Sequence, residues 1–322
     1  MLILGDDSHH NGKFPWVTGA LVAVNVIVFL VQVGVGERFT NGYSLVPAEI
    51  TEFRDIAKKE RVKVRVHDHY RDRFGVEHNL AHDEYITINH YPGPFPIVLT
   101  LITSMYLHGD VMHLIGNMWF LLVFGRNVEC ALSHRRFLMF YTCCGVVGGL
   151  AHVASDAHSM IPCLGASGAI SGVLGAYVAI HPLNKIKCWF GWWIGVIELP
   201  ALVVIGVWFL MQYVSAFFTL EHPEYSDGIA YWDHLGGFVT GIAFIWGTIY
   251  YLKYQQARTQ QTSYSADAVP GPVPAPLAES APLPQPVADP FASFLPSTGI
   301  RAGEPKQLPA HDPFASFLPA EK

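Results

Sequence analysis

The stretch Leu164–Ile180 reads Leu-Gly-Ala-Ser-Gly-Ala-Ile-Ser-Gly-Val-Leu-Gly-Ala-Tyr-Val-Ala-Ile and contains no charged residue. Gly168, Gly172 and Gly175 follow one another at intervals of four and three residues, so they share one face of a helix. Faces of small residues let membrane helices approach closely. The stretch therefore predicts a membrane helix that packs tightly against a second helix, with Ser167 near its beginning.

Six apolar stretches in all approach the roughly 20 residues that a helix needs to cross a bilayer. Hydrophobic residues make up 51% of the 322-residue chain and charged residues 14%, against roughly 25% charged in an ordinary soluble domain. The first stretch is too long for the apolar core of a signal peptide, and no Ala-x-Ala site follows it. We therefore expect an all-α membrane protein, a bundle of six transmembrane helices within residues 14–254. Besides Leu164–Ile180, the expected spans are Phe14–Val35, Val111–Phe124 with an apolar lead-in from Ile97, Phe137–Ala154, Leu199–Leu220 and His234–Leu252.

Basic residues set the expected orientation in the membrane. The connections Ser155–Cys163 and Glu221–Asp233 carry no Lys or Arg, which predicts that they lie outside. The short N-terminus (residues 1–13) and the C-terminal tail are then cytoplasmic, and the protein is expected in the cell membrane. The net charge of −6 leaves no basic face for nucleic acid, so no nucleic-acid partner is expected. The connections and tail predicted to lie inside carry Arg126, Arg135, Arg136, Lys185, Lys187, Lys253 and Arg258.

The segment 36–95 is a long loop that this topology puts outside. It holds nine Lys or Arg residues, but loops of about 60 residues or more translocate largely regardless of charge. The alternation in Arg61–Val66 and again in Tyr85–Ile88 predicts a small β-hairpin. The irregular spacing of the loop histidines, without any cysteine, does not match a metal site, so no metal is expected. These histidines are His67, His69, His78, His82 and His90.

Residues 255–322 form a Pro-rich tail that we expect to be disordered, because it cannot bury enough apolar area to fold. Thirteen of the 22 prolines lie in Pro270–Pro319. The octapeptide Asp-Pro-Phe-Ala-Ser-Phe-Leu-Pro occurs twice, at Asp289–Pro296 and at Asp312–Pro319. The repeat fits either a docking motif for a partner or a duplicated piece of spacer, and composition does not decide between them.

Polar residues inside the spans indicate where a site lies, because they are costly in lipid and usually face a cavity. Ser167 lies among glycines at a helix start, where free backbone N–H groups suit an oxyanion. His234 opens the last span and shares a helix face with Gly237 and Gly241. Two glycine faces in contact would bring His234 close to Ser167, as a general base beside an activated hydroxyl. The alternative is a histidine at headgroup level.

His113 and Asn117 lie four residues apart in the second span, so both project from one face. As hydrogen-bond donors they would complete an oxyanion hole near Ser167. The alternative is that they form hydrogen bonds between helices, which contribute roughly 0.6–2 kcal/mol each.

Taken together, three motifs resemble the rhomboid family of intramembrane serine proteases: His113-Leu-Ile-Gly-Asn117, Gly165-Ala-Ser167-Gly168 and His234-Leu-Gly-Gly237. They fall in spans two, four and six, in the order of the family. The resemblance covers roughly residues 14–254 and leaves out the long loop and the tail. Three further stretches are similar to the family: Tyr106-Leu-His-Gly, Phe124-Gly-Arg-Asn-Val-Glu129 and Glu198-Leu-Pro-Ala.

The resemblance implies a Ser167–His234 dyad, in which Ser167 is the nucleophile and His234 the general base. The backbone N–H of Ser167 and the side chains of His113 and Asn117 would bind the oxyanion. Gly165, Gly168, Gly237 and Gly241 would pack the helices. Substrates would be single-span membrane proteins, cut near the outer face of the bilayer, with membrane lipid as the surrounding partner and no metal or organic cofactor.

The sequence also departs from the family pattern. Ser171 stands one turn after the nucleophile, where some members carry an aromatic residue that stacks on the histidine. Asp233 precedes the histidine, where alanine is frequent, and the Trp-Arg pair found upstream of the second span in many members is missing. Adjacent residues do not face each other on a helix, so Asp233 is not expected to act as the acid of a triad.

Three other functions compete with an active protease. A catalytically inactive rhomboid-like protein would bind membrane helices without cutting them, but the presence of both Ser167 and His234 argues against it. A transporter is disfavoured because no repeat relates the spans. A zinc protease is disfavoured because the chain contains no His-Glu-x-x-His.

Overall fold

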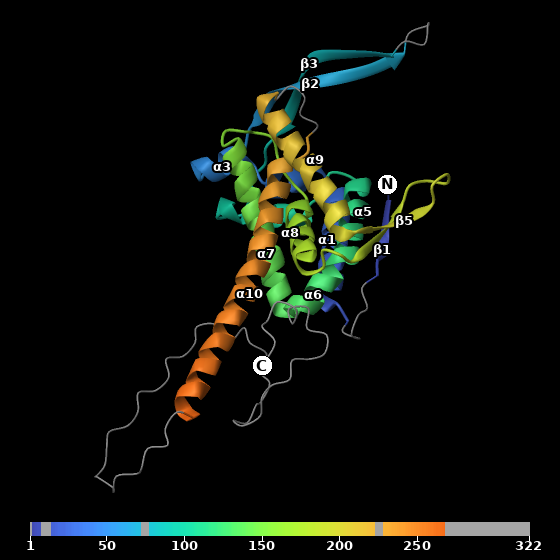
Figure 1. Ribbon diagram of the computed structural model, residues 1–322. Helices are drawn as coiled ribbons and strands as arrows, with labels where there is room; N and C mark the ends of the chain where they lie inside the picture. The colour runs from blue at the N-terminus through green and yellow to red at the C-terminus, as the bar shows by residue number, and fades with distance from the viewer. Residues whose placement is uncertain (1, 8–13, 72–76, 223–227, 268–322) are drawn as a thin grey trace, which may run out of the picture. The chain divides into compact units, whose positions relative to one another are not determined.

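The computed structural model describes residues 2–7, 14–71, 77–222 and 228–267 (Figure 1). The chain divides into two compact units, Met1–Trp246 and Gly247–Lys322. The first unit contains every candidate site residue, and the following description concerns this unit unless stated otherwise. The predicted docking motifs in the tail lie outside the described residues.

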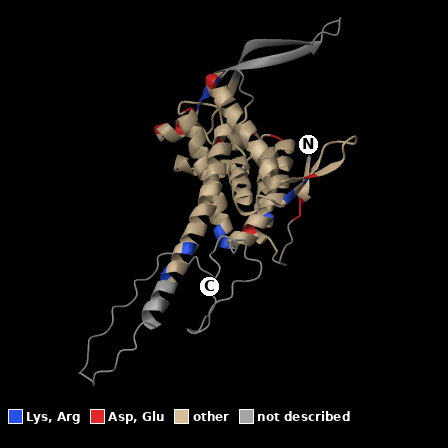
Figure 2. Cartoon of the chain, in the orientation of Figure 1, with Lys and Arg blue, Asp and Glu red and all other residues tan. Residues whose placement is uncertain are grey.

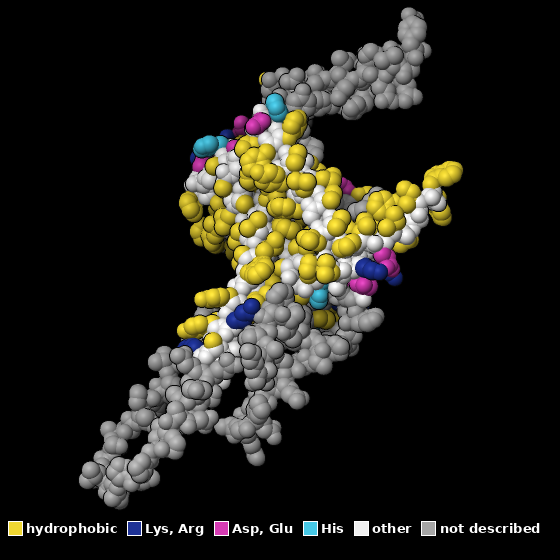
Figure 3. Space-filling model, viewed as in Figure 1, with side chains coloured by type: hydrophobic (Ala, Val, Ile, Leu, Met, Phe, Trp, Pro, Cys, Tyr) yellow, Lys and Arg dark blue, Asp and Glu magenta, His cyan; other side chains and the backbone are white. Residues whose placement is uncertain are grey.

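In the part of the chain that the structure describes, four helices are long and apolar enough to cross a membrane: α1 (Trp16–Val35), α7 (His134–Ser155), α9 (Ala201–Glu221) and the first part of α10 (Tyr231–Asp267). The chain is therefore a multi-pass membrane protein. Charged residues are scarce along the bodies of these helices (Figure 2), and apolar side chains cover most of the visible helix surface (Figure 3). The predicted second span is instead a pair of helical segments, Ile97–Tyr106 and Val111–Leu132, bent by 82° at the break between them.

The bent pair is built from short elements. Its first arm consists of η1 (Ile97–Leu99), α4 (Thr100–Thr103) and η2 (Ser104–Tyr106). Its second arm consists of α5 (Val111–Phe120), a π-helical turn η3 (Leu121–Gly125) and α6 (Arg126–Leu132). The second arm begins at Asp110, whose carboxylate accepts the backbone N–H of His113 at 2.9 Å. This cap fixes the start of the helix that carries His113 and Asn117.

Helix α8 (Ser167–Ile180) has 14 residues and is shorter than the other apolar helices. All of its residues except Ser167 and Ala179 are buried. In Figure 1 it lies among α1, α5, α7 and α9. A helix that is apolar on all sides and enclosed by protein needs no lipid-facing stripe, which explains how a run of small residues can form the centre of the unit.

The prediction of an all-α protein is incomplete, because two small sheets are present. One sheet has the order β1-β4-β5, formed antiparallel by Leu2–Asp6, Lys185–Trp189 and Val196–Pro200. Ile186 and Cys188 are buried while Lys185 and Lys187 are exposed, the alternation typical of a half-buried strand. β4 and β5 form a hairpin whose turn lies between Trp189 and Val196, and β1 lies in the predicted cytoplasmic N-terminus (residues 1–13).

Strand β1 is joined to the helices by side chains as well as by its sheet. The indole N–H of Trp119 donates to the carbonyl of Ile3 at 2.7 Å. The Tyr177 hydroxyl, on α8, donates to the carboxylate of Asp6 at 2.6 Å. The first residues of the chain are therefore attached to the helix that begins with Ser167.

The long loop after α1 contains α2 (Glu37–Tyr43), α3 (Pro47–Glu52) and a hairpin of β2 (Lys59–Arg71) and β3 (Glu77–Asn89). The hairpin was expected from residues 61–66 and 85–88, and its strands are longer than those patterns. In the second unit, α10 continues to Asp267, so the tail predicted to be disordered from residue 255 begins with helix. No proline interrupts this part of the chain, and the first one after the last span is Pro270.

Candidate active site

Ser167 is the first residue of α8. Two residues before it lies Gly165, which has an unusual backbone conformation. Gly165 has φ +137°, a conformation that side chains disfavour, and its N–H donates to the carbonyl of Ser104 at 2.9 Å. A Cβ added to Gly165 would lie 3.0 Å from Nε2 of His113 and 3.4 Å from Oγ of Ser167. The nucleophile candidate and the His113 ring therefore lie on the same side of Gly165. Gly165 lies before the first residue of α8. Helix packing was predicted for Gly165, whereas the structure places it next to His113 and Ser167.

The glycine faces of α8 and α10 are in backbone contact. A Cβ on Gly237 would overlap the carbonyl of Gly168, and one on Gly241 would overlap the carbonyl of Gly172. Gly168 directly follows Ser167, and Gly237 lies one turn after His234 on α10. The contact between the glycine faces thus sets Ser167 and His234 at neighbouring places on two helices that touch.

The ring of His234 is held from α9. Its Nδ1 lies 2.7 Å from Oε1 of Gln212, and the ring centroid of Trp208 lies 6.2 Å from that of His234. An amide oxygen only accepts hydrogen bonds, so with Oε1 of Gln212 as its partner Nδ1 is the donor of this bond. The contact thus favours the His234 tautomer that takes a proton through Nε2.

The contact of His113 favours the opposite tautomer. The backbone N–H of Gly109 donates to Nδ1 of His113 at 3.4 Å, an arrangement that leaves the ring proton to Nε2. That Nε2 is the atom next to Gly165. One histidine thus offers a donor and the other an acceptor, as an oxyanion ligand and a general base require.

Asn117 lies one helical turn after His113 and is buried at 8% exposure. Its Nδ2 has no hydrogen-bond partner among the described residues. Unpaired buried amides are rare in folded proteins and call for a functional explanation. Asn117 is therefore a donor with free capacity on the helix face that carries His113.

Sequence comparisons relate this chain to known proteins. Residues 97–251 match the model of the Rhomboid domain. The chain contains a Rhomboid domain. It is 25% identical to RHOMBOID-like protein 1 of Arabidopsis thaliana over 257 residues, which cover 79% of this chain and 59% of that protein. It is 42% identical to Rhomboid protease GluP of Bacillus subtilis (strain 168) over 85 residues, which cover 26% of this chain and 16% of that protein.

A third relative is Presenilin-associated rhomboid-like protein A, mitochondrial, of Danio rerio, with 28% identity over 167 residues, or 50% of this chain and 40% of that protein. The chain thus spans less than two thirds of the length of each of these relatives. The match extends from η1 to α10, so it includes all three motifs that carry the resemblance.

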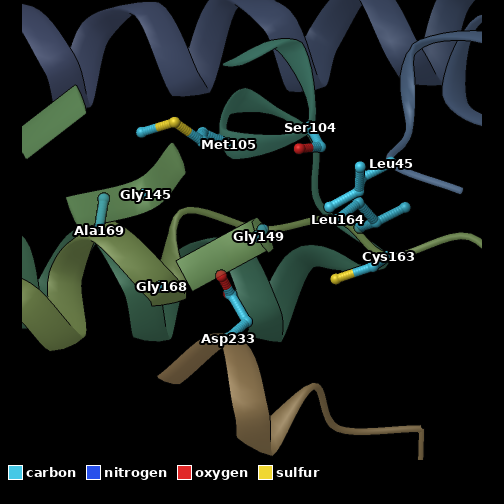
Figure 4. Close-up of a pocket in the computed structure, with 11 residues that line it drawn as sticks. Leu45, Ser104, Met105, Gly145, Gly149, Cys163, Leu164, Gly168, Ala169 and Asp233 are labelled. Atoms are coloured by element: carbon cyan, nitrogen blue, oxygen red, sulfur yellow. The ribbon is translucent and has the colours of Figure 1, made fainter. Parts of the chain in front are cut away.

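Asp233 has a structural place in this rhomboid that the sequence did not indicate. It is buried, and its carboxylate accepts a hydrogen bond from the backbone N–H of Gly168. Its side chain also lies against Gly148 of α7. Figure 4 shows the carboxylate extending from α10 toward Gly168. Asp233 therefore caps α8 from another helix and points away from the ring of His234 that follows it.

Asp233 and Cys163 line the same small pocket, together with Ser104 and Gly165 (Figure 4). Burial, with a contribution from the Asp233 carboxylate, raises the pKa of the Cys163 thiol well above its ordinary value. A thiol that stays protonated is a poor nucleophile. Cys163 is thus a poor candidate for the nucleophile.

The position of Ser171 shows how the domain accommodates one departure from the family pattern. The Ser171 hydroxyl donates to the carbonyl of Ser167 at 2.7 Å and so bonds within its own helix. The aromatic neighbour of His234 is Trp208, which comes from α9. His234 thus has an aromatic neighbour although Ser171, one helical turn after Ser167, is not aromatic.

Gln32 of α1 holds the turn before α5. It accepts the backbone N–H of His108 at 3.0 Å and donates to the carbonyl of the same residue at 3.2 Å. The ring of His108 in turn contacts that of His113 edge-on at a centroid distance of 5.2 Å. Within the described residues, no group of three or more His, Cys, Asp or Glu side chains is placed to hold a metal ion.

The sequence analysis missed Gln212, Gln32 and the role of Asp233. A signal for the two glutamines was present, because both are amides inside apolar stretches, where polar side chains indicate a site or an interhelical bond.

Proposed function

We propose that this rhomboid is an intramembrane serine endopeptidase that uses Ser167 as nucleophile and His234 as general base. The observation that carries the proposal is the pair of contacts at Nδ1 of the two histidines beside Ser167. The acceptor Oε1 of Gln212 at His234 favours a free lone pair on Nε2, and the donor N–H of Gly109 at His113 favours a proton on Nε2. A binding protein without chemistry would have no need for this division of roles.

The chemistry follows from the positions of these groups. Oγ of Ser167 attacks the carbonyl carbon of the scissile peptide bond while its proton passes to Nε2 of His234. The protonated imidazole then gives that proton to the leaving amine, and the C–N bond breaks. Water attacks the acyl-enzyme in the same way, with His234 again as base, and releases the second product.

The negative charge that develops on the carbonyl oxygen needs donors that are in place beforehand. We assign this role to the backbone N–H of Ser167, Nε2–H of His113 and Nδ2 of Asn117. The unpaired Nδ2 of Asn117 supports the assignment, because a donor with no partner in the resting protein loses no bond when the oxyanion forms.

The proposed substrates are single-span membrane proteins that are cut near the outer face of the bilayer. The relative from Bacillus subtilis is named a rhomboid protease, which supports proteolysis at the level of the family. In the proposed topology all six apolar stretches span the cell membrane, surrounded by lipid, and both termini are cytoplasmic. The duplicated octapeptide would then lie in the cytoplasm, available to a docking partner. The mechanism requires no cofactor.

The test is cleavage of a generic single-span substrate by purified protein in proteoliposomes. We expect the wild type to cut, and Ser167→Ala, His234→Ala and the double variant to be equally inactive, because residues that act as one unit are strongly non-additive. Each variant is first checked for insertion and for its unfolding temperature. Turnover at the wild-type rate by either folded single variant would remove the dyad.

A further inference from the structure

We propose that Gln212 is a positioning residue that fixes the tautomer and orientation of His234, in the place that an acidic side chain takes in a Ser-His-Asp triad. The inference rests on the proposed function, because it concerns the general base of that reaction. In a triad, the third residue accepts the Nδ1 proton and thereby leaves Nε2 free for the nucleophile. Oε1 of Gln212 makes this contact at 2.7 Å.

The surroundings of Gln212 hold it in place. Trp208 lies one helical turn earlier on α9, so the two side chains share a face, and both contact His234. The Trp208 ring also lies 6.2 Å from that of Phe238 on α10, and Phe209 stacks on Phe238 at 4.4 Å. These aromatic contacts join α9 to α10 one helical turn from the Gln212–His234 bond. The bond is therefore part of a packed interface between two helices.

The residue next to His234 cannot take this role. The carboxylate of Asp233 accepts the N–H of Gly168 and is directed at α8. Nδ1 of His234 is directed at α9. The neutral amide is also the cheaper acceptor at this depth, because an ionised side chain inside a membrane domain is costly without a partner.

An amide and a carboxylate differ in one measurable respect. Both accept the Nδ1 proton, but only a carboxylate adds a charge that stabilises the protonated imidazole. The titratable groups that face His234 are His113 on α5 and His152 on α7, and neither supplies a negative charge. Replacing Gln212 by glutamate should therefore move the acidic limb of the pH–rate profile to higher pH while keeping the acceptor oxygen.

The experiment compares three variants of the full chain in proteoliposomes: Gln212→Met, which keeps the size and loses the acceptor, Gln212→Glu, and the control Met211→Leu. Met211 is 62% exposed on the same helix. We expect Gln212→Met to lower kcat by roughly 10- to 100-fold, part of what a general base supplies, with KM within about twofold by the same argument. Gln212→Glu should keep most of the wild-type kcat and move the acidic limb of the pH–rate profile to higher pH. The control should match the wild type.

The reaction rate of Ser167 with a fluorophosphonate should follow kcat across the variants, because it reports the nucleophile without a peptide substrate. The inference is overturned if folded Gln212→Met keeps the wild-type kcat. It is also overturned if Gln212→Glu loses as much activity as Gln212→Met, or if the acidic limb does not move.

A second measurement does not depend on cleavage. The ¹⁵N chemical shifts of the histidine side chains report the tautomer directly, and the spectrum of His234→Ala identifies the signals of His234. We expect Nδ1 to be protonated in the wild type and the other tautomer to gain in Gln212→Met. If the tautomer changes in Gln212→Met but the wild type cuts no substrate, the proposed function is contradicted and the positioning role stays intact. If the tautomer is the same in the wild type and in Gln212→Met, the positioning role alone is overturned.

Discussion

Helices α1 and α8 both begin without a side-chain cap of their own, and each is capped by a carboxylate from a distant part of the chain. At α1, Glu129 accepts the backbone N–H groups of Val17 and Thr18 at 2.9 and 2.8 Å, and the Thr18 hydroxyl at 2.7 Å. At α8, Asp233 accepts the N–H of Gly168. Both contacts place carboxyl oxygens at the positive end of a helix, where acceptor groups are stabilising.

The two caps differ in what lies beside them. Glu129 also bonds to His134 at the start of α7, so it joins α1, α6 and α7 far from Ser167. Asp233 and Gly168 are the direct chain neighbours of His234 and Ser167. The same kind of cap therefore anchors helices at one end and lies beside the proposed dyad at the other. The loss of a buried cap should therefore lower kcat only where the cap lies beside the proposed dyad.

The largest effect is expected at Asn117, which lies at the end with the proposed dyad and whose Nδ2 has no hydrogen-bond partner among the described residues. Asn117→Ala should lower kcat by about 10²–10³, the usual scale for the loss of one oxyanion donor. KM should change less, because the charge exists only in the transition state. The measurement is kcat per folded enzyme together with the unfolding temperature. A variant that is destabilised but keeps its kcat would place Asn117 among the packing residues, with His113→Ala as the parallel case.

A smaller effect, and one of the opposite kind, is expected at Glu129. Glu129→Gln should destabilise the fold by about 2–3 kcal/mol, since it weakens several buried hydrogen bonds to a charged group. This should appear as an unfolding temperature lower by several degrees. kcat per folded molecule should stay near the wild type. If kcat falls tenfold while the unfolding temperature is unchanged, the separation of the two ends is wrong.

Asp233→Asn should combine both effects at lower amplitude. The amide keeps an acceptor oxygen for Gly168 but loses the charge, so we expect kcat to fall by roughly fivefold to tenfold, equivalent to about 1 kcal/mol. Asp233→Leu keeps the approximate size but has no acceptor, and it should be worse in both kcat and unfolding temperature. Equal values for the wild type and both variants would mean that the α8 cap contributes nothing.

The smallest effect is expected from removing the tail. Truncation after Gln260 takes away the Pro-rich segment and the last turns of α10, none of which belongs to the first unit. Cleavage of a generic substrate and the unfolding temperature should both match the full chain. Loss of activity in a truncated protein that still inserts would show that the tail acts on the site.

The sequence indicates the apolar stretches and the three motifs because each depends on spacing along one helix. Gly237 follows His234 by three residues in any α-helix, so the shared face could be predicted. The Gln212–His234 bond could not, because it depends on how α9 is rotated against α10. The contact of Asp233 with Gly168 could not be predicted either, because it depends on how α10 is rotated against α8. Strand β1 was missed since Leu2–Asp6 is too short to have a period of its own.

Strand β1 also has a practical consequence for producing the protein. It pairs with β4 from Leu2 onward, and Asp6 receives the Tyr177 hydroxyl. An affinity tag or fluorescent protein fused in front of Met1 would have to leave from the end of a paired strand, two residues from the carbonyl that Trp119 binds. A fusion placed after residue 267 leaves that strand untouched, so the C-terminus is the better site for purification and labelling.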